Sequence, residues 1–394
     1  MPVLNRRHFL TGLGLSAALL TAPGLALAAL PGDRRFVFVA LRGAMDGLHA
    51  VPPVGDPDYA AARGALALKE GVIPLEGIYG LHPALGGLSG LYRKGELLLV
   101  HAVASPYRER SHFDGQDVLE GGGTAPHLLL TGWLGRSLPL LGAGRSTGLA
   151  VGQSVPLSLR GPQPVESWSP SPLAGLSPTL VEKLRGLYEG DALLSMALEE
   201  GVQSESFVAQ TLGGGMARGG GGNFRSLAEA TGKLLAAVDG PRIAVMDAGG
   251  WDTHTAQGNG QQGRMVGPLN QLGDGLAAMA QAMGPAWSKT IVVCASEFGR
   301  TVAMNGTNGT DHGTGGVALL AGGAVAGGRV VAKWPGLSKA ALYQGRDLMP
   351  TSDLRAVLKG VLRDHLGLSE TALAKTVFPG SDGLGGMSGL VKMV

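Results

Sequence analysis

The sequence FVFVALRGAMDGL, residues 36–48, joins an apolar run to a turn that carries one carboxylate. Phe36–Leu41 lacks polar alternation, which is typical of a strand covered on both faces of a parallel sheet. Gly43 and Gly47 flank Asp46 and let the chain turn tightly after the strand. Open parallel sheets bind ligands at the carboxyl ends of their strands, so Asp46 is either a ligand residue or an ordinary turn aspartate.

Four more apolar runs repeat this pattern and are predicted strands: Leu97–Val103, Arg242–Met246, Thr290–Ala295 and Val317–Ala321. Helical periodicity lies between and after them, at His82–Arg93, Ser111–Glu120, Phe224–Val238, Met265–Met283 and Ser352–His365. Thr351 or Ser352 is the expected N-cap of the last helix. Alternating strands and helices predict an α/β fold with a doubly wound, mainly parallel sheet and helices on both faces.

One stretch, from about residue 126 to residue 222, does not follow this alternation of strands and helices. It begins rich in Pro, Ser and Gly, continues as an expected helix pair around Thr179–Leu212, and ends in the glycine-rich run Gly213–Gly222. We interpret it as an insertion or cap on one α/β domain that spans residues 29–394.

Composition restricts the possible functions. The formal net charge of the 394 residues is +2, and aromatic residues make up 5%. A nearly neutral chain argues against nucleic-acid binding by phosphate neutralisation. The single cysteine, Cys294, excludes an internal disulfide and a cysteine-based zinc cluster, so any metal ligands must be His, Asp or Glu.

The N-terminus is predicted to be an export signal. Arg6 and Arg7 precede an apolar stretch from Phe9 to about Ala28, and Ala26-Leu27-Ala28 fits a cleavage site. The arginine pair favours twin-arginine export, which makes the export machinery a partner and the periplasm or exterior the location. The alternative is an N-terminal membrane anchor. No later window has an apolar run long enough to span a bilayer.

The second predicted strand is followed by Arg110-Ser111-His112. Ser111 is a candidate nucleophile, because the N-terminus of a helix attracts anions. The alternative is a simple N-cap, since Ser111 and Asp114 form a pattern like a capping box. His112 is a candidate ligand, proton donor or supporting group.

Acidic and histidine residues also follow the later strands. Asp252 and His254, two residues apart, can share a cation on one face of a loop. Glu297 follows the fourth strand, with Arg300 as a possible clamp for oxyanions. Asp311 and His312 lie in a glycine-flanked loop before the fifth strand. A metal site explains why carboxylates and imidazoles converge from five strand ends.

The order of these residues resembles the alkaline phosphatase and sulfatase superfamily. The residues of the motifs themselves resemble more closely an exported bacterial branch, the domain-of-unknown-function family 1501. The resemblance spans roughly residues 34–335, with the insertion matching least. The matching motifs are Leu41–Leu48, Arg110–Asp117, Gly249–His254, Ser296–Thr301 and Asp311–Gly313, together with the twin-arginine signal.

The resemblance implies an alkaline-phosphatase-like fold with one or two divalent cations, for which zinc, manganese and calcium are options. Asp46, Ser111 and Glu297 would border the first cation. Asp252, His254 and His312 would border the second. Only Thr253 separates the Asp and His where the superfamily usually has three residues, and Ser296-Glu297 replaces an Asp-His pair. The second cation therefore lacks a ligand unless His112 or Asp311 supplies it.

The activity implied is hydrolysis or transfer of phosphate or sulfate esters in the cell envelope. Ser111 would attack, His112 would protonate the leaving group, and Arg300 would neutralise the equatorial oxygens. One alternative is a metal-binding envelope or secretion protein that keeps the fold without catalysis. Another is a module built around the insertion that binds polysaccharide or lipid headgroups.

Overall fold

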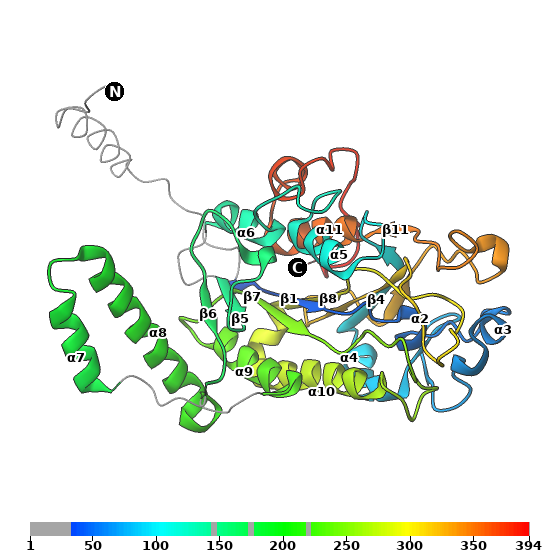
Figure 1. Cartoon of the computed structure of the whole chain (residues 1–394), viewed down its shortest axis with the longest axis horizontal. Coiled ribbons are helices and arrows are strands. Elements are labelled where there is room, and N and C mark those ends of the chain that lie inside the picture. The colour runs from blue at the N-terminus through cyan, green and yellow to red at the C-terminus, as the bar shows by residue number, and fades with distance from the viewer. Residues whose placement is uncertain (1–32, 143–147, 172–176, 218–221, 394) are drawn as a thin grey trace.

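A nine-stranded sheet lies at the centre of the computed structural model, with helices on both faces (Figure 1). The structure describes residues 33–142, 148–171, 177–217 and 222–393. Three predicted features lie outside these ranges: the export signal at residues 1–28, the start of the α/β domain at residue 29, and residues 218–221 of the glycine-rich run.

All five predicted strands are present, and with them the α/β class and the mainly parallel sheet are confirmed. They are β1 (Arg35–Leu41), β4 (Leu97–Ala104), β7 (Ile243–Ala248), β8 (Thr290–Ala295) and β9 (Gly316–Ala321). The strand order is β10-β4-β9-β8-β1-β7-β5-β6, and β11 also pairs with β4. The additional strands are short: β5 (Gly148–Val151), β6 (Glu166–Trp168), β10 (Arg329–Val331) and β11 (Ser352–Asp353). A separate hairpin contains β2 (Ile73–Pro74) and β3 (Gly80–Leu81).

Strand β9 departs from the predicted parallel pattern, because it pairs antiparallel with both β4 and β8. The segment of residues 296–315 between β8 and β9 contains no helix that would carry the chain back across the sheet. Parallel pairing needs such a crossover, and without it the chain returns in the opposite direction. An apolar strand covered on both faces has the same sequence pattern in either direction.

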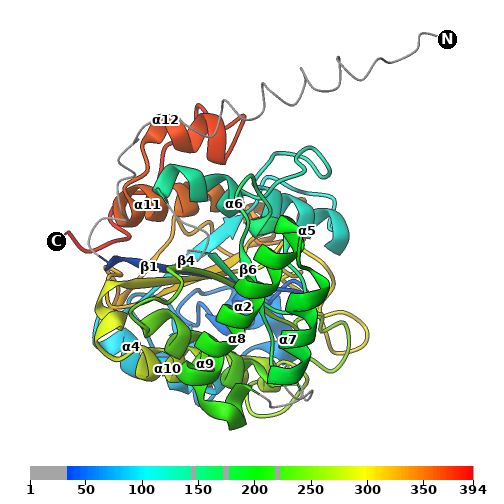
Figure 2. The same cartoon turned by 90° about the vertical axis from the view of Figure 1, so that its left-hand side faces the viewer.

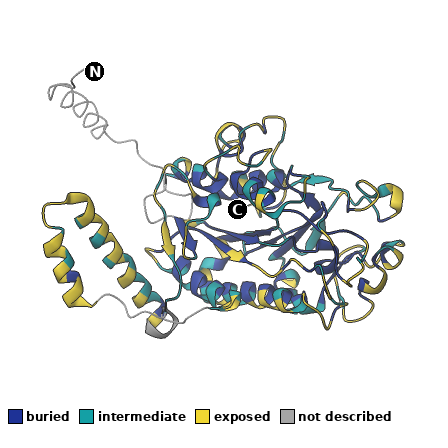
Figure 3. Cartoon of the chain, viewed as in Figure 1, coloured by how far each residue is buried: buried dark blue, intermediate teal, exposed yellow. Residues whose placement is uncertain are grey.

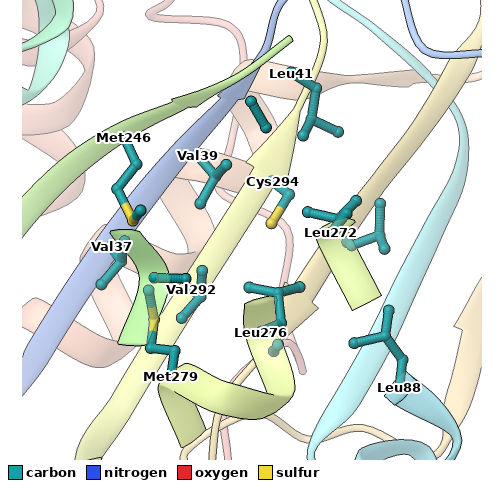
Figure 4. Close-up of a cluster of buried hydrophobic side chains, with 14 of the residues drawn as sticks. Val37, Val39, Leu41, Leu88, Met246, Leu272, Leu276, Met279, Val292 and Cys294 are labelled. Atoms are coloured by element: carbon teal, nitrogen blue, oxygen red, sulfur yellow. The ribbon is translucent and has the colours of Figure 1, made fainter. Parts of the chain in front are cut away.

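The two faces of β1 bury alternate residues in two different cores. Val37, Val39 and Leu41 pack on the side of helices α9 (Phe224–Ala236) and α10 (Val266–Met283). Figure 4 shows them facing Leu272, Leu276 and Met279 of α10. Phe36 and Phe38 point to the opposite face and contact the indole of Trp133 edge-on, at centroid distances of 6.1 and 5.2 Å. The central strands are thus fully covered, which explains their lack of polar alternation.

The predicted helices form within a few residues of their expected bounds. They are α4 (Ser89–Arg93), α5 (His112–Gly121), α9 (Phe224–Ala236), α10 (Val266–Met283) and α11 (Leu354–Leu366). The segment before α4 is a 3₁₀ helix, Pro83–Leu88, and the N-cap of α11 is Asp353 rather than Thr351 or Ser352. Short helices α2 (Gly47–Ala50), α3 (Tyr59–Arg63), α6 (Trp133–Ser137) and α12 (Glu370–Ala372) complete the layers. Within the described ranges, no helix combines the length and apolarity needed to cross a bilayer.

The predicted insertion is only in part a cap. Strands β5 and β6 lie within it and extend the main sheet in parallel beyond β7. Helices α7 (Pro178–Leu187) and α8 (Ala192–Ala217) form the expected pair and project from the body as an exposed arm (Figures 1 and 3). The arm faces the viewer in Figure 2. Strands as short as β5 and β6 were not predicted, because turn-type residues surround them.

Candidate metal centre

Every candidate residue lies in a loop or at the start of a helix, at one edge of the sheet. Strands β1, β7 and β8 are parallel, and β4 shares their direction because both β4 and β8 are antiparallel to β9. The carboxyl ends of these four strands therefore meet at one edge, where β9 begins. Asp46 follows β1, Ser111 and His112 follow β4, Asp252 and His254 follow β7, Glu297 and Arg300 follow β8, and Asp311 and His312 precede β9.

Three histidines converge on the carboxylate of Asp252. Oδ1 of Asp252 lies 3.0 Å from Nε2 of His254 and 3.3 Å from Nε2 of His312. Its Oδ2 lies 3.6 Å from Nε2 of His112. The Nε2 atoms of His254 and His312 are 3.0 Å apart. His112, Asp252 and His312 each offer a ligand atom within 4.8 Å of the other two, a spacing that suits a bound metal ion.

Two of these rings are fixed through Nδ1. Nδ1 of His312 lies 2.9 Å from the carbonyl oxygen of Arg110, which can only accept a hydrogen bond. Nδ1 of His254 lies 3.0 Å from Oδ1 of Asp311. A hydrogen bond from Asn305, with the bond from His254, lowers the pKa of Asp311, so this carboxylate is an acceptor too. In both rings Nδ1 carries the proton, and in the neutral ring Nε2 presents a lone pair to Asp252.

The third ring, His112, is held by Glu297. Nδ1 of His112 lies 2.7 Å from Oε1 of Glu297, which also accepts hydrogen bonds from Gly43 N and Gln116 Nε2. Burial alone would raise the pKa of Glu297, but these bonds, led by the one from His112, lower it. The bond to Glu297 raises the pKa of His112, whose Nε2 is buried and has no hydrogen-bond partner among the described residues.

The donor set of this centre fits a divalent cation. Three imidazole nitrogens whose Nδ1 protons are held by carboxylates or a carbonyl, together with one carboxylate, are the ligand types that zinc and manganese take. Acceptors on the distal ring nitrogen orient metal-binding histidines in the same way. The Nε2 atoms of His254 and His312 lie 3.0 Å apart, a contact that either a proton on one ring or a shared cation can bridge. Burial lowers the pKa of His312, which keeps that ring neutral and able to bind metal.

Arg300 is buried beneath Asp252 rather than open to a substrate. Its Nη1 donates to Oδ1 of Asp252 at 2.6 Å, and its Nε donates to Oγ1 of Thr310 at 3.1 Å. Burial would raise the pKa of Asp252, but the Arg300 hydrogen bond and the charges of Arg300, His254 and His112 together lower it. Oγ1 of Thr310 in turn donates to Gln257 at 2.7 Å. Arg300 therefore orients Asp252 and holds it ionised.

Asp46 lies at the far end of this hydrogen-bond chain. Its Oδ2 accepts from Gln257 Nε2 at 2.7 Å and from Arg63 Nη2 at 2.5 Å, and its Oδ1 accepts from His49 N in the first turn of α2. Asp46 and Arg63 are both fully buried. Arg63 and Gln257 thus engage Oδ2 of Asp46, and within the described ranges no hydrogen bond or ion pair joins Asp46 to the three histidines.

Ser111 lies between two residues that are tied to the centre. The preceding residue, Arg110, has a positive φ of 63° and gives its carbonyl to His312. The following residue is His112. Ser111 is the N-cap residue of α5 by position, but its side chain makes no capping hydrogen bond, so the capping alternative is not what the structure shows. Among the described residues, no acceptor contacts the N–H groups of residues 112–114.

The structure thus brings together His112, Asp252, His254 and His312, while Glu297 and Asp311 each support one ring. Sequence reasoning missed Arg63 and Gln257, which hold Asp46, and Asp347, which binds the guanidinium of Arg110 at 2.8 Å. Asp347 lies far along the chain, at no strand end, and carries no sequence signal. The signal for His112 as the third ring was its place beside Ser111 at the same sheet edge.

The chain resembles solved structures at low identity. It shares 12% identity with the C-terminal periplasmic domain of EcEptC from Escherichia coli, covering 90% of this chain and 91% of that one, at a TM-score of 0.42. With the phosphonate monoester hydrolase of Agrobacterium radiobacter it shares 12% identity, covering 85% of this chain and 74% of that one, at a TM-score of 0.33. With murine ectonucleotide pyrophosphatase/phosphodiesterase 5 it shares 9% identity, covering 68% of this chain and 57% of that one, at a TM-score of 0.29.

A search of curated proteins found no match to the sequence. A family model, in contrast, matches most of the chain. The model of one family matches residues 104–377, which include Ser111, all four residues of the histidine and aspartate cluster, and both supporting carboxylates. The chain therefore belongs to the family described as "Protein of unknown function (DUF1501)".

Proposed function

We propose that this protein is an exported, metal-dependent hydrolase or phosphotransferase of phosphate or sulfate esters. The observation that carries the proposal is the convergence of three imidazole Nε2 atoms on Asp252 next to Ser111, a serine whose hydroxyl caps nothing. One cation held by His112, Asp252, His254 and His312 fits this arrangement. The proposal moves His112 from proton donor to ligand and assigns Glu297, Asp311 and Arg300 to supporting roles.

An anionic substrate fits the start of α5. The N–H groups of residues 112–114 point out of a ten-residue helix and find no acceptor among the described residues. Such an N-terminus binds phosphate or sulfate oxygens through its N–H groups and its dipole. The guanidinium of Arg110 is engaged by Asp347, and that of Arg108 bonds the carbonyls of Ser105 and Tyr107. The helix start is therefore the better anion site.

The chemistry follows from these positions. Oγ of Ser111 attacks phosphorus or sulfur, the new O–P or O–S bond forms, and the bond to the leaving oxygen breaks. The serine proton passes to solvent, and the leaving oxygen takes a proton from solvent. Water then cleaves the serine ester and restores the hydroxyl. A bound cation would supply Lewis acidity and lower the pKa of an oxygen that it contacts.

Metal analysis together with ester hydrolysis tests the proposal. Purified mature protein should hold about one equivalent of a divalent cation by mass spectrometry of metals, and His254→Ala should lose it. The control is His127→Ala, which removes an exposed histidine outside the cluster. Hydrolysis of aryl phosphate, phosphodiester and sulfate esters should require the metal. A protein that binds the cation but cleaves none of these esters would instead be a non-catalytic metal-binding envelope protein.

A further inference from the structure

A cavity of about 380 Å³ lies at the end of β7, between the sheet and helices α9 and α10. Cavities of this size are common for small-molecule sites, which run from about 300 to 1,000 Å³. The apolar part of the walls comes from the side chains of Phe224, Leu227, Trp251, Pro268 and Leu272, and Gln271 adds a polar side chain. Asp247 contributes a carboxylate whose side chain is 48% exposed.

The cavity and the proposed metal centre share one loop. Trp251 lines the cavity, and the next residue, Asp252, is the carboxylate on which the three histidines converge. The cavity wall and the proposed metal centre are therefore built from adjacent residues of one loop.

A chain of hydrogen bonds links the same two places. Asp247 Oδ2 contacts Nε of Arg42 at 3.0 Å, and Arg42 donates to Gln116 at 2.9 Å. Gln116 donates at 3.2 Å to Oε1 of Glu297, the oxygen that holds His112. The exposed carboxylate of Asp247 is thus connected, through Arg42 and Gln116, to Glu297, which holds His112 of the metal centre.

Glycines shape the wall nearest the centre. Gly250 has φ +93°, and a Cβ there would lie 3.0 Å from Cγ of Pro268, so only glycine lets the loop close on α10. Gly249 and Gly267 also line the cavity, but neither has a positive φ. A Cβ at either position would meet no atom within 4 Å, so a larger side chain can enter without backbone strain.

We infer that this cavity binds the organic group of the ester, an inference that rests on the proposed function. The apolar walls favour a compact aromatic or branched group, because its burial removes apolar surface from water. Asp247 can accept a hydrogen bond from a hydroxyl or amine on that group. The same carboxylate repels a second phosphate or carboxylate. The substrate class is therefore a phosphate or sulfate monoester of a small apolar alcohol or phenol that carries a neutral or cationic polar group.

Filling the cavity tests this inference. Gly267→Leu places an isobutyl group at the cavity wall, and Gly249→Leu does the same from the loop. The matched control is Gly90→Leu, at a helical glycine of α4 whose Cβ also meets nothing within 4 Å. Values of kcat/KM are measured for phenyl phosphate, 4-(aminomethyl)phenyl phosphate and methyl phosphate. Metal content and melting temperature are measured for every variant to show that it is folded and loaded.

Both cavity variants should lose about 10–200-fold in kcat/KM for the two aryl esters, the range expected when an apolar contact in a pocket is lost. Hydrolysis of methyl phosphate should stay within about twofold of wild type, and the control should resemble wild type throughout. The aminomethyl ester should be preferred over phenyl phosphate in wild type but not in Asp247→Asn. Equal losses for aryl and methyl esters, or no loss in either filled variant, would overturn the inference.

A wild-type protein that cleaves no ester would refute the proposed function but still leave the cavity testable. Calorimetric titration of the metal-loaded protein with benzylamine then decides. Binding that Gly267→Leu abolishes and Gly90→Leu retains supports a site for an apolar amine. Absence of binding to wild type overturns the cavity as a ligand site.

Discussion

The carbonyl oxygen of Arg110 accepts a hydrogen bond from Nδ1 of His312 at 2.9 Å. This contact joins the loop before β9 to the turn that starts α5, although the two residues are 202 positions apart. It fixes the tautomer of His312 and holds in place the residue directly before Ser111. The backbone of the proposed nucleophile and a proposed metal ligand are therefore positioned by the same bond.

Asp311→Asn should weaken metal binding without abolishing it. The Asp311 carboxylate contacts Nδ1 of His254 at 3.0 Å, and losing such a support typically costs 10–100-fold in metal affinity. Competition with a chelator of known affinity measures the change. Asp382→Asn, at an exposed aspartate near the C-terminus, is the control. An unchanged affinity in Asp311→Asn would show that His254 is oriented by other contacts or does not bind the metal.

Asp46→Ala should destabilise the fold and leave the metal in place. Removal of Asp46 leaves the guanidinium of Arg63 buried without its counter-charge, which costs about 3–5 kcal/mol. Urea unfolding measures the free energy, and metal analysis is done on the folded fraction. Replacing both residues, Asp46→Leu with Arg63→Met, should recover much of the stability. Loss of metal from a variant that remains stable would instead restore Asp46 as a ligand.

Acid should destabilise the protein through its buried histidines. Burial, with repulsion from Arg34, lowers the pKa of His365 to about 4, against 6.5 in the unfolded chain. The folded pKa is the lower one, so the stabilisation is complete above pH 6.5 and is lost as the pH falls to 4. A shift of this size corresponds to about 3 kcal/mol. The free energy of unfolding should fall less steeply over this range in His365→Gln, whose amide can still donate to the carbonyl of Arg35. Parallel pH curves for the two proteins would contradict the assignment.

The sequence predicts the central strands well, because Phe36–Leu41 and its counterparts are apolar on both faces and are followed within a few residues by Gly, Ser, Pro or Asp. It also predicts which edge carries the chemistry, since parallel strands end together. It does not predict how individual carboxylates are used. Glu297 and Asp46 both lie in the turn that follows a strand, yet Glu297 holds His112 and Asp46 pairs with Arg63. Those pairings depend on contacts between distant segments, which local pattern does not encode.

Export by the twin-arginine route remains a prediction from residues that the structure does not describe. Replacing Arg6 and Arg7 by lysine should retain a tagged protein in the cytoplasm in its unprocessed form. Cell fractionation and the mass of the mature N-terminus measure the outcome, with cleavage expected after Ala28. Normal processing of the double lysine variant would assign the signal to another export route.

Ser111→Ala separates catalysis from stability. A lost N-cap costs about 0.5–2 kcal/mol, but the hydroxyl of Ser111 makes no capping bond, so the change in unfolding free energy should stay below this range. Ester hydrolysis should nevertheless disappear, because no hydroxyl is left to attack. Metal content should remain that of wild type, since His112, Asp252, His254 and His312 are all retained.

Ser111→Asp makes the test of Ser111 sharper. Aspartate is a good N-cap, so it would restore any capping that Ser111→Ala lost, but it supplies no hydroxyl for attack. The proposed mechanism therefore requires Ser111→Asp to be folded, metal-bound and inactive. A covalent phosphoserine or sulfoserine, trapped by acid quench and located by mass spectrometry at Ser111 of the wild type, would support the same conclusion directly. If Ser111→Ala keeps wild-type hydrolysis, the attacking group must be water, and the histidine and aspartate cluster alone would carry the reaction.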